Sequence, residues 1–184
     1  MDVLNDNPKE YVEFLKKAGN NEDPEVVHYA VTAMVEISKE NDYTLQKLSR
    51  EYSKNPDDIS VLTEYCDFLW TVLEQKLLTG QVEIMNRNLF SQLISKKLEN
   101  VESLEDYIRY AENELSLENY TKSCEILSRA EKKYADTEEL ILIKFKYYSL
   151  LKRGDKIKEM ISDLQERRVF VSGKVKEAIA FWKA

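Results

Sequence analysis

The sequence predicts an all-α fold, an α-solenoid of about ten helices arranged as antiparallel hairpins. Only 4 Gly and 3 Pro occur in 184 residues, whereas charged residues make up 33%. Scarce helix breakers together with abundant Glu, Lys and Leu favour long helices. Few stretches alternate apolar and polar residues with a period of two, so little or no strand is expected. No linker rich in Pro, Gly or Ser divides the chain, which predicts a single domain over residues 1–184.

The first hundred residues contain signals for five helices. Asn7-Pro8 and Asp23-Pro24 each place a capping side chain before a proline at the first helical position, which starts a helix. Asn55-Pro56 ends a helix, because the residue before proline disfavours helical backbone, and Gly80 marks a turn. The expected helices cover 8–18, about 24–40, a stretch holding Leu45, Leu48 and Tyr52, 57–78 and 81–99.

The remaining residues contain signals for five more helices. Ser103, with Asp106 three residues later, resembles a capping box, with Asp in place of the usual Glu. Gly154-Asp155 marks a turn, and Ser172 is expected to cap a last short helix. Apolar positions within each segment are spaced by threes and fours, as on one face of a helix. The helices are expected around Tyr107–Leu115, Cys124–Tyr134, 138–152, Ile157–Leu164 and Val175–Trp182.

Residues 104–137 alternate large and small side chains at the spacing of a 34-residue helical hairpin, and this pattern resembles the tetratricopeptide repeat. Small residues let two helices approach closely, and large ones fill the space between turns. Glu114 departs from the pattern, because an aromatic is usual there, and so does Ala135, where proline is usual. The matching residues are bulky Tyr107, Tyr110 and Leu127 and small Ala111, Ser123 and Ala130.

Residues 138–168 and 24–56 look like poorer copies of the same repeat. The resemblance therefore implies tetratricopeptide-like repeats and a capping helix over 103–184, preceded by divergent helical hairpins over 1–100.

A second resemblance lies near the N-terminus. The run from Asn21 to Ala30, Asn-Glu-Asp-Pro-Glu-Val-Val-His-Tyr-Ala, resembles the start of the cytoplasmic region of the E protein of the Pel exopolysaccharide system. In that family a helical repeat domain follows two membrane-spanning helices. The resemblance implies a fragment held at the inner face of the cell membrane by helices that this sequence lacks. It also implies a scaffold role in the synthase complex, with the D protein, a cyclic-di-GMP receptor, as the foremost partner.

The charge of the chain argues against two classes of partner. The net charge is −7, of which residues 1–100 carry all, with 11 Lys/Arg against 18 Asp/Glu. An acidic chain without a basic stripe is a poor ligand for nucleic acid and for anionic membrane surfaces. No apolar run is long enough to span a membrane, and the first ten residues do not form a signal peptide. Cys66 and Cys124 are expected to be buried, reduced thiols, so a cytoplasmic location is expected.

The motifs of enzymes and of metal or cofactor sites are missing from the sequence. His28 is the only histidine and is expected to be packed or to bond a helix end, because no second His or Cys of ligand spacing accompanies it. The carboxylate pairs lie at helix starts or on polar faces, where the helix dipole favours them. No glycine-rich phosphate loop and no nucleophile elbow occur. We therefore predict no catalytic residue, no metal and no cofactor.

Protein binding is the function that the sequence predicts best. Tyr110 and Tyr147, with Arg109 and Lys144, lie on the first helices of the two C-terminal repeats, which line the groove in tetratricopeptide arrays. Tyrosine offers contact area at a small cost in entropy, so we expect these four residues to bind a partner. Two alternatives remain open. One is a helical enzyme with His28 beside a buried carboxylate, and the other is a homodimer formed through Ile179 and Trp182.

Overall fold

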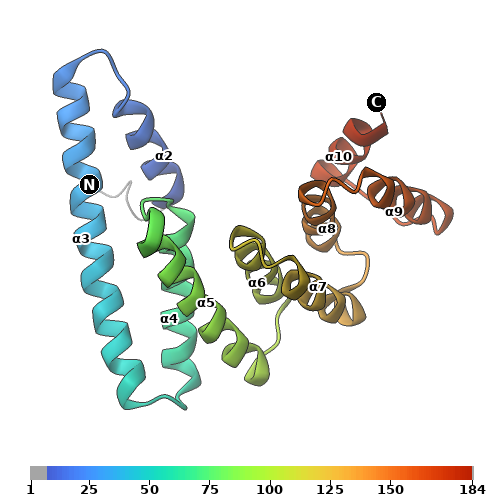
Figure 1. Ribbon diagram of the computed structural model, residues 1–184, viewed down its shortest axis with the longest axis horizontal. Coiled ribbons are helices and arrows are strands. Elements are labelled where there is room, and N and C mark those ends of the chain that lie inside the picture. The colour runs from blue at the N-terminus through green and yellow to red at the C-terminus, as the bar shows by residue number, and fades with distance from the viewer. Residues whose placement is uncertain (1–7, 184) are drawn as a thin grey trace. The chain divides into compact units, whose positions relative to one another are not determined.

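The computed structural model describes residues 8–183, and these residues form nine α-helices in which neighbours along the chain pack together, with no strand among them (Figure 1). This confirms the predicted fold class. Asn7 of the first predicted capping pair lies outside the described residues. The helices are α2 (Pro8–Ala18), α3 (Pro24–Lys54), α4 (Ile59–Glu74), α5 (Gly80–Asn100), α6 (Leu104–Ser116), α7 (Tyr120–Tyr134), α8 (Glu138–Leu150), α9 (Gly154–Glu166) and α10 (Gly173–Lys183).

The chain divides into two compact units, Met1–Asn100 and Val101–Ala184. The division falls between the two halves that the sequence distinguishes by composition, and the description of 1–184 as a single domain stays a prediction. The first unit carries the whole net charge of −7, since residues 101–184 hold 16 Lys/Arg and 16 Asp/Glu. The two units therefore differ in charge as well as in packing.

In the first unit, α3 packs against both α2 and α4, and α4 packs against α5. The ammonium group of Lys16 on α2 donates to the backbone oxygens of Gln75 and Lys76, at 2.8 and 3.0 Å, where α4 ends. Both carbonyls follow Glu74, the last residue of α4, and the lysine satisfies them. The core of this unit comes from apolar side chains of α2, α3, α4 and α5, among them Val12, Leu15, Leu48, Leu62, Leu69, Phe90 and Ile94.

One long helix replaces two that the sequence predicts. Helix α3 runs unbroken from Pro24 to Lys54, so the expected break near Glu40-Asn41 is wrong, and 24–56 is not a helical hairpin. The Asn41 side chain is buried and donates to the Gln75 Oε1 atom at 2.6 Å. Asparagine favours helix ends when its amide bonds the local backbone, but here the amide is engaged with another helix.

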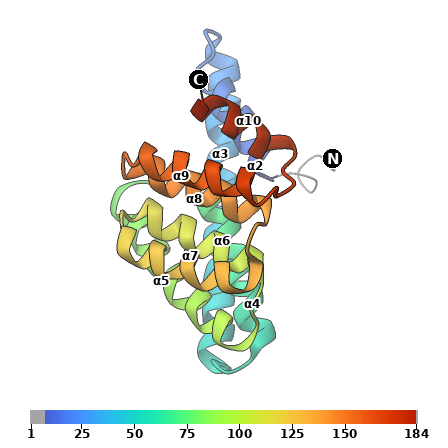
Figure 2. The ribbon, with the colours of Figure 1, turned by 90° about the vertical axis from the view of Figure 1, so that its right-hand side faces the viewer.

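The second unit confirms a period of 34 residues. Helices α6 and α8 begin at Leu104 and Glu138, and α7 and α9 begin at Tyr120 and Gly154, so each pair is offset by 34. In the two views α8 lies between the α6–α7 hairpin and α10 (Figures 1 and 2), in agreement with the packing of α8 against all three helices.

The turn inside each hairpin also repeats. Asn119 N donates to Glu114 O at 2.8 Å, and 34 residues later Arg153 N donates to Tyr148 O at 2.8 Å. These bonds belong to the Schellman motif, which needs a residue of positive φ. Glu118 (φ 58°) and Lys152 (φ 57°), again 34 residues apart, are those residues.

The two hairpins fill this shared backbone differently. In the first, three fully buried positions carry small residues: Ala111, Ser123 and Ala130. In the second, large side chains occupy the same repeat positions, namely Phe145, Ile157 and Leu164, and these join Ile141, Ile161 and Val175 in one apolar core. The second hairpin matches the repeat pattern less well because bulky side chains there fill the space between its helices, where the first hairpin has close helix contact.

Candidate functional site

Three of the four residues predicted to bind a partner contact α7. The Tyr110 side chain is buried, and Lys122 Nζ on α7 lies 5.1 Å from its ring centroid. Lys144 Nζ on α8 pairs with Glu131 on α7 at 2.5 Å. Within its own helix Arg109 pairs with Glu105 at 2.5 Å and is about a quarter exposed. The partner role of these residues stays a prediction.

Tyr147 also faces α7. Its side chain is 9% exposed, and its ring meets that of Tyr148 edge-on, with 5.1 Å between the ring centroids. Burial, a hydrogen bond with Cys124 and the nearby Tyr148 raise the pKa of Tyr147 to about 12. The hydroxyl is therefore neutral and engaged at physiological pH. The expectation that both thiols are buried is wrong for Cys124, which is exposed, whereas Cys66 is buried.

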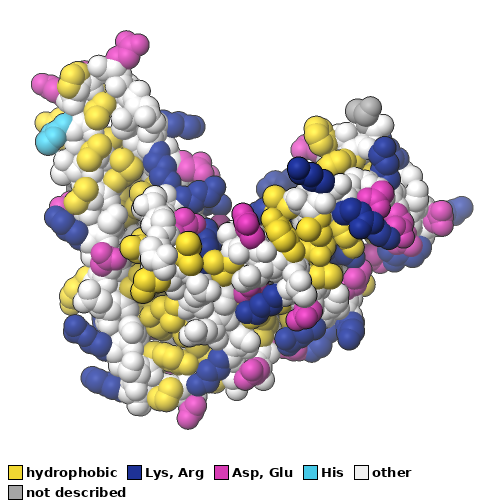
Figure 3. Space-filling view, viewed as in Figure 1, with side chains coloured by type: hydrophobic (Ala, Val, Ile, Leu, Met, Phe, Trp, Pro, Cys, Tyr) yellow, Lys and Arg dark blue, Asp and Glu magenta, His cyan; other side chains and the backbone are white. Residues whose placement is uncertain are grey.

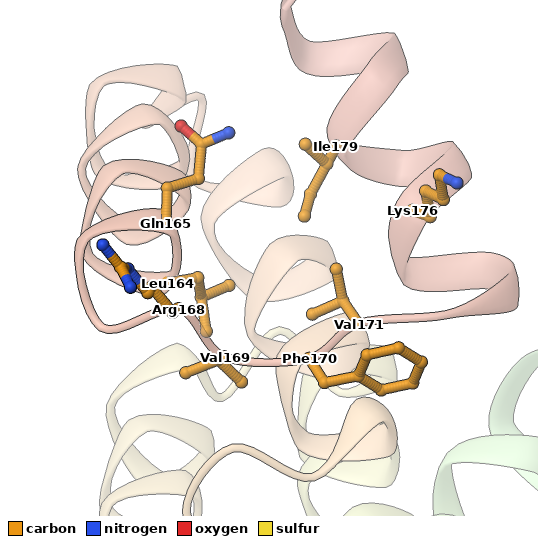
Figure 4. Close-up of a pocket in the computed structure, with 8 residues that line it drawn as sticks. All are labelled: Leu164, Gln165, Arg168, Val169, Phe170, Val171, Lys176 and Ile179. Atoms are coloured by element: carbon orange, nitrogen blue, oxygen red, sulfur yellow. The ribbon is translucent and has the colours of Figure 1, made fainter.

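An open pocket of about 550 Å³ lies between α9, α10 and the segment that joins them (Figure 4). Gln165 and Arg168 border it at the end of α9, and Ile179 points from α10 toward α9 (Figure 4). Its size is within the range of binding pockets in proteins. We call this site the α9–α10 pocket; its lining consists of Leu164, Gln165, Arg168, Val169, Phe170, Val171, Lys176 and Ile179.

Local backbone structure fixes the lining of the α9–α10 pocket. Helix α9 ends in a Schellman motif, in which Val169 N donates to Leu164 O at 2.9 Å and Arg168 adopts a φ of 53°. At the other end of the connection, the Glu138 carboxylate accepts from both the backbone N–H and the hydroxyl of Ser172, each at 2.7 Å. Both ends of the connecting segment are thus held, which presents Phe170 at 86% exposure.

The α9–α10 pocket combines an apolar floor with positive charge. Arg168 and Lys176 are its charged lining residues, and no Asp or Glu lines it. Residues 164–183 hold five Lys/Arg against two Asp/Glu, a balance of +3, although the whole chain carries −7. The pocket is therefore a cationic surface in an acidic protein, and it complements an apolar ligand that carries negative charge.

Sequence reasoning missed this pocket because it assigned 168–172 to a simple connection. A signal was present, since Val169, Phe170 and Val171 are three consecutive apolar residues outside a helix. Connections are normally polar, so an apolar run there indicates either burial or binding. The structure shows a mixture, with Val169 and Val171 partly buried and Phe170 exposed.

Two smaller cavities lie within single units. One of about 260 Å³ lies in the first unit, lined by Ser38, Asn41, Asp42, Leu77, Leu78, Thr79 and Val82. The other, of about 50 Å³, lies where α7, α8 and α9 meet in the second unit. Its lining includes the ion pair that Arg167 makes with Asp136, in which the Nη1 and Nη2 atoms donate to the two carboxylate oxygens at 2.7 Å each.

His28 is not packed, so that part of the expectation from sequence is wrong. Its side chain is exposed near the start of α3 and meets the ring of Tyr29 edge-on, with 5.9 Å between the ring centroids (Figure 3, cyan). Within residues 8–183, no group of three or more His, Cys, Asp or Glu side chains is arranged to hold a metal ion. No helix in this part of the chain combines the length and the apolar character needed to cross a membrane.

Among the described carboxylates, Glu114 is fully buried. Lys122 Nζ lies 3.1 Å from its Oε1 atom, and Asn119 Nδ2 donates to its Oε2 atom at 2.9 Å. Burial lowers the pKa of Lys122, but hydrogen bonds with Tyr110 and Glu114 outweigh it, so the net shift is upward. The carboxylate that interrupts the repeat pattern is thus held inside the α6–α7 hairpin.

The chain was compared with family models, with curated proteins and with solved structures. No family model matches it, and no curated protein and no solved structure matches it either.

Proposed function

We propose that the chain is a protein-interaction scaffold, a helical-repeat domain that docks onto partner proteins and performs no chemistry itself. The observation that carries the proposal is the α9–α10 pocket, where Phe170, Arg168 and Lys176 are exposed on a backbone that is fixed at both ends. Aromatic and arginine side chains supply most of the energy at protein interfaces. Phe170 and Arg168 provide one of each at the pocket.

The lining chemistry favours a macromolecular ligand over a small substrate. Five of the eight lining side chains are aliphatic or aromatic. Such a surface binds mainly through burial of apolar area, at roughly 25 cal/mol per Å², and a partner protein can offer enough area to offset the cost of association.

A finer proposal follows from the resemblance to the Pel E protein. The segment from Asn21 to Ala30 includes the start of α3, where His28 and Tyr29 are exposed and therefore available to a partner. On this proposal the chain works at the inner face of the cell membrane as part of a synthase complex. The cytoplasmic region of the Pel D protein is the first partner to test.

The experiment is a two-step search for a stoichiometric complex. The tagged full chain is purified from its native cells, and co-purifying proteins are identified by mass spectrometry. Each candidate, and in every case the cytoplasmic region of the Pel D protein, is then purified and mixed with the chain in sedimentation velocity runs. We expect one partner to form a complex of fixed stoichiometry. A chain that sediments alone in every mixture would contradict the scaffold proposal.

A homodimer is the second candidate, favoured by exposed apolar side chains along α3 (Figure 3). Tyr29, Val31 and Val35 are 72%, 45% and 46% exposed. The residues first expected to form such an interface, Ile179 and Trp182, are instead partly buried against the core of the second unit. Sedimentation equilibrium of the chain alone distinguishes the candidates, since only a dimer gives a mass that rises with concentration and falls on Val31→Asp.

A further inference from the structure

The surface that forms the α9–α10 pocket has an equivalent one repeat earlier, and there a helix covers it. Subtracting 34 from Ile179 gives Phe145, which lies in one apolar core with Ile157 and Ile161 of α9. The connecting segments differ in length, since residues 135–137 join α7 to α8 and residues 167–172 join α9 to α10. Phe170 corresponds to Asp136, and Arg167 at the end of α9 binds that carboxylate through two hydrogen bonds of 2.7 Å.

The α9–α10 pocket is therefore built like the surface on which α9 lies in the preceding repeat. Gln165 corresponds to Glu131, which lines the small cavity together with Met160 and Arg167 of α9. Among the described residues of the second unit, no helix covers the later copy of this surface, and Phe170 is 86% exposed there. Its backbone is held by the Schellman motif at the end of α9 and by the bonds that Ser172 donates to Glu138.

The charge of the surface reverses between the two copies. Two carboxylates of the earlier copy, Glu131 and Asp136, become Gln165 and Phe170.

Two uncharged residues of the earlier copy, Tyr134 and Leu142, become Arg168 and Lys176. Helix α9 meets the earlier copy with a cation, Arg167. A helix that fits the later copy must therefore present carboxylates in place of that arginine.

We propose that the α9–α10 pocket is a helix-docking site that takes an amphipathic helix of a partner protein, one with an apolar stripe flanked by Asp or Glu. This inference rests on the proposed scaffold function and names its binding surface and the chemistry of its partner. The apolar stripe packs against Val169, Phe170 and Ile179, and the flanking carboxylates meet Arg168 and Lys176. Recognition of an amphipathic helix by a groove of this composition is a common mode of protein binding.

The test uses two probes copied from the chain itself. Each is a fluorescent peptide with the sequence of residues 154–167, stapled between positions 158 and 162, which are exposed in α9. The staple is needed because free helices of this length are marginal in water. One peptide keeps Arg167, and the other carries Arg167→Glu. Fluorescence anisotropy with the full chain, up to about 1 mM, measures both affinities. We expect the Arg167→Glu peptide to bind roughly threefold or more tightly.

Matched variants of the full chain locate the binding. Phe170→Ser is expected to weaken binding of the Arg167→Glu peptide about tenfold, because it removes a large apolar contact. Phe181→Ser is its control, since Phe181 is 74% exposed on α10 and does not line the pocket. Lys176→Glu is expected to weaken binding roughly threefold or more, with Lys174→Glu as control. Both controls should stay within about twofold of the wild type.

Three outcomes would overturn the inference. The first is equal or undetectable binding of the two peptides, and the second is pocket variants that bind as their control variants do. The third is a chain whose mass rises with concentration, whereas the Phe170→Ser chain stays monomeric. The last outcome would make a second copy the occupant. Failure here is distinguishable from failure of the scaffold proposal, because a partner that still binds the Phe170→Ser chain would leave the scaffold function standing on another surface.

Discussion

The ion pair of Glu114 and Lys122 joins a buried carboxylate of α6 to a half-exposed lysine of α7. The Glu114 carboxylate is fully buried, whereas the Lys122 side chain is 47% exposed. Removing the lysine leaves a buried charge that has lost its cation, and removing the carboxylate leaves a cation that water can reach. We therefore predict that Lys122→Met destabilises the second unit more than Glu114→Gln does.

The expected size of the effect follows from the geometry. At 3.1 Å and an effective dielectric constant of about 20, the attraction is about 5 kcal/mol before any cost is subtracted. Desolvation of the carboxylate and partial access of water to the lysine reduce the net value. We expect Lys122→Met to lower the free energy of unfolding by about 2 kcal/mol and Glu114→Gln by about 1 kcal/mol. In the double variant, Lys122→Met with Glu114→Gln, the neutral amide should restore most of the free energy of unfolding that Lys122→Met alone loses.

The assay is urea unfolding followed by tryptophan fluorescence. The chain has two tryptophans, Trp70 in the first unit and Trp182 in the second. A Trp70→Phe background makes the signal report the second unit alone. Lys132→Met, at an exposed lysine of the same helix, controls for the general effect of replacing lysine.

Two results would refute the reasoning about this pair. One is a Lys122→Met chain as stable as the Lys132→Met control. The other is a double variant less stable than Lys122→Met alone, because the neutral amide of Glu114→Gln removes the buried negative charge.

Three further predictions concern the second unit. Glu118→Gly and Lys152→Gly should each raise the free energy of unfolding by about 0.5–1 kcal/mol in urea titrations, because glycine tolerates positive φ. Arg167 lowers the pKa of Asp136, so the ion pair stabilises the fold above the ordinary aspartate pKa, and this stability is lost in acid. Arg167→Met should therefore lower the free energy of unfolding at pH 7 and make it depend less on pH between about pH 4 and pH 2. The raised pKa of Tyr147 means that the fold favours the neutral phenol, so the wild-type chain should lose stability above about pH 10. Tyr147→Phe should lose less, as measured by urea midpoints at about pH 9 and about pH 11.

Local signals in the sequence predicted most helix boundaries. Asp23 caps α3 by accepting from Glu25 N, and Ser103 caps α6 by accepting from Asp106 N, because a cap depends on residues two or three positions away. Local signals could not show that the helix continues through Asn41. The Asn41 amide bonds Gln75, which lies 34 residues further along the chain.

The candidate site was harder to predict than the fold. The sequence places Tyr110 and Tyr147 on the correct helices, but their burial depends on α7, which covers the side of α6 and α8 from which they project. Periodicity shows which residues share a face, and it does not show which face a neighbouring helix covers. Phe170 lies outside the helices, so the helical period gave no information about it.

The two hairpins of the second unit show how a repeated backbone can carry different chemistry. The turns at Glu118 and Lys152 share their φ angles and hydrogen bonds, although one side chain is acidic and the other basic. Backbone bonds and the positive φ fix the turn, so its side chain is free to vary. Side chains also differ on the helices at the same repeat positions, where Leu142 and Phe145 of α8 become Lys176 and Ile179 of α10. If the α9–α10 pocket takes a partner helix, as we propose, these changes in side chains give it a specificity distinct from that of the internal contact between α8 and α9.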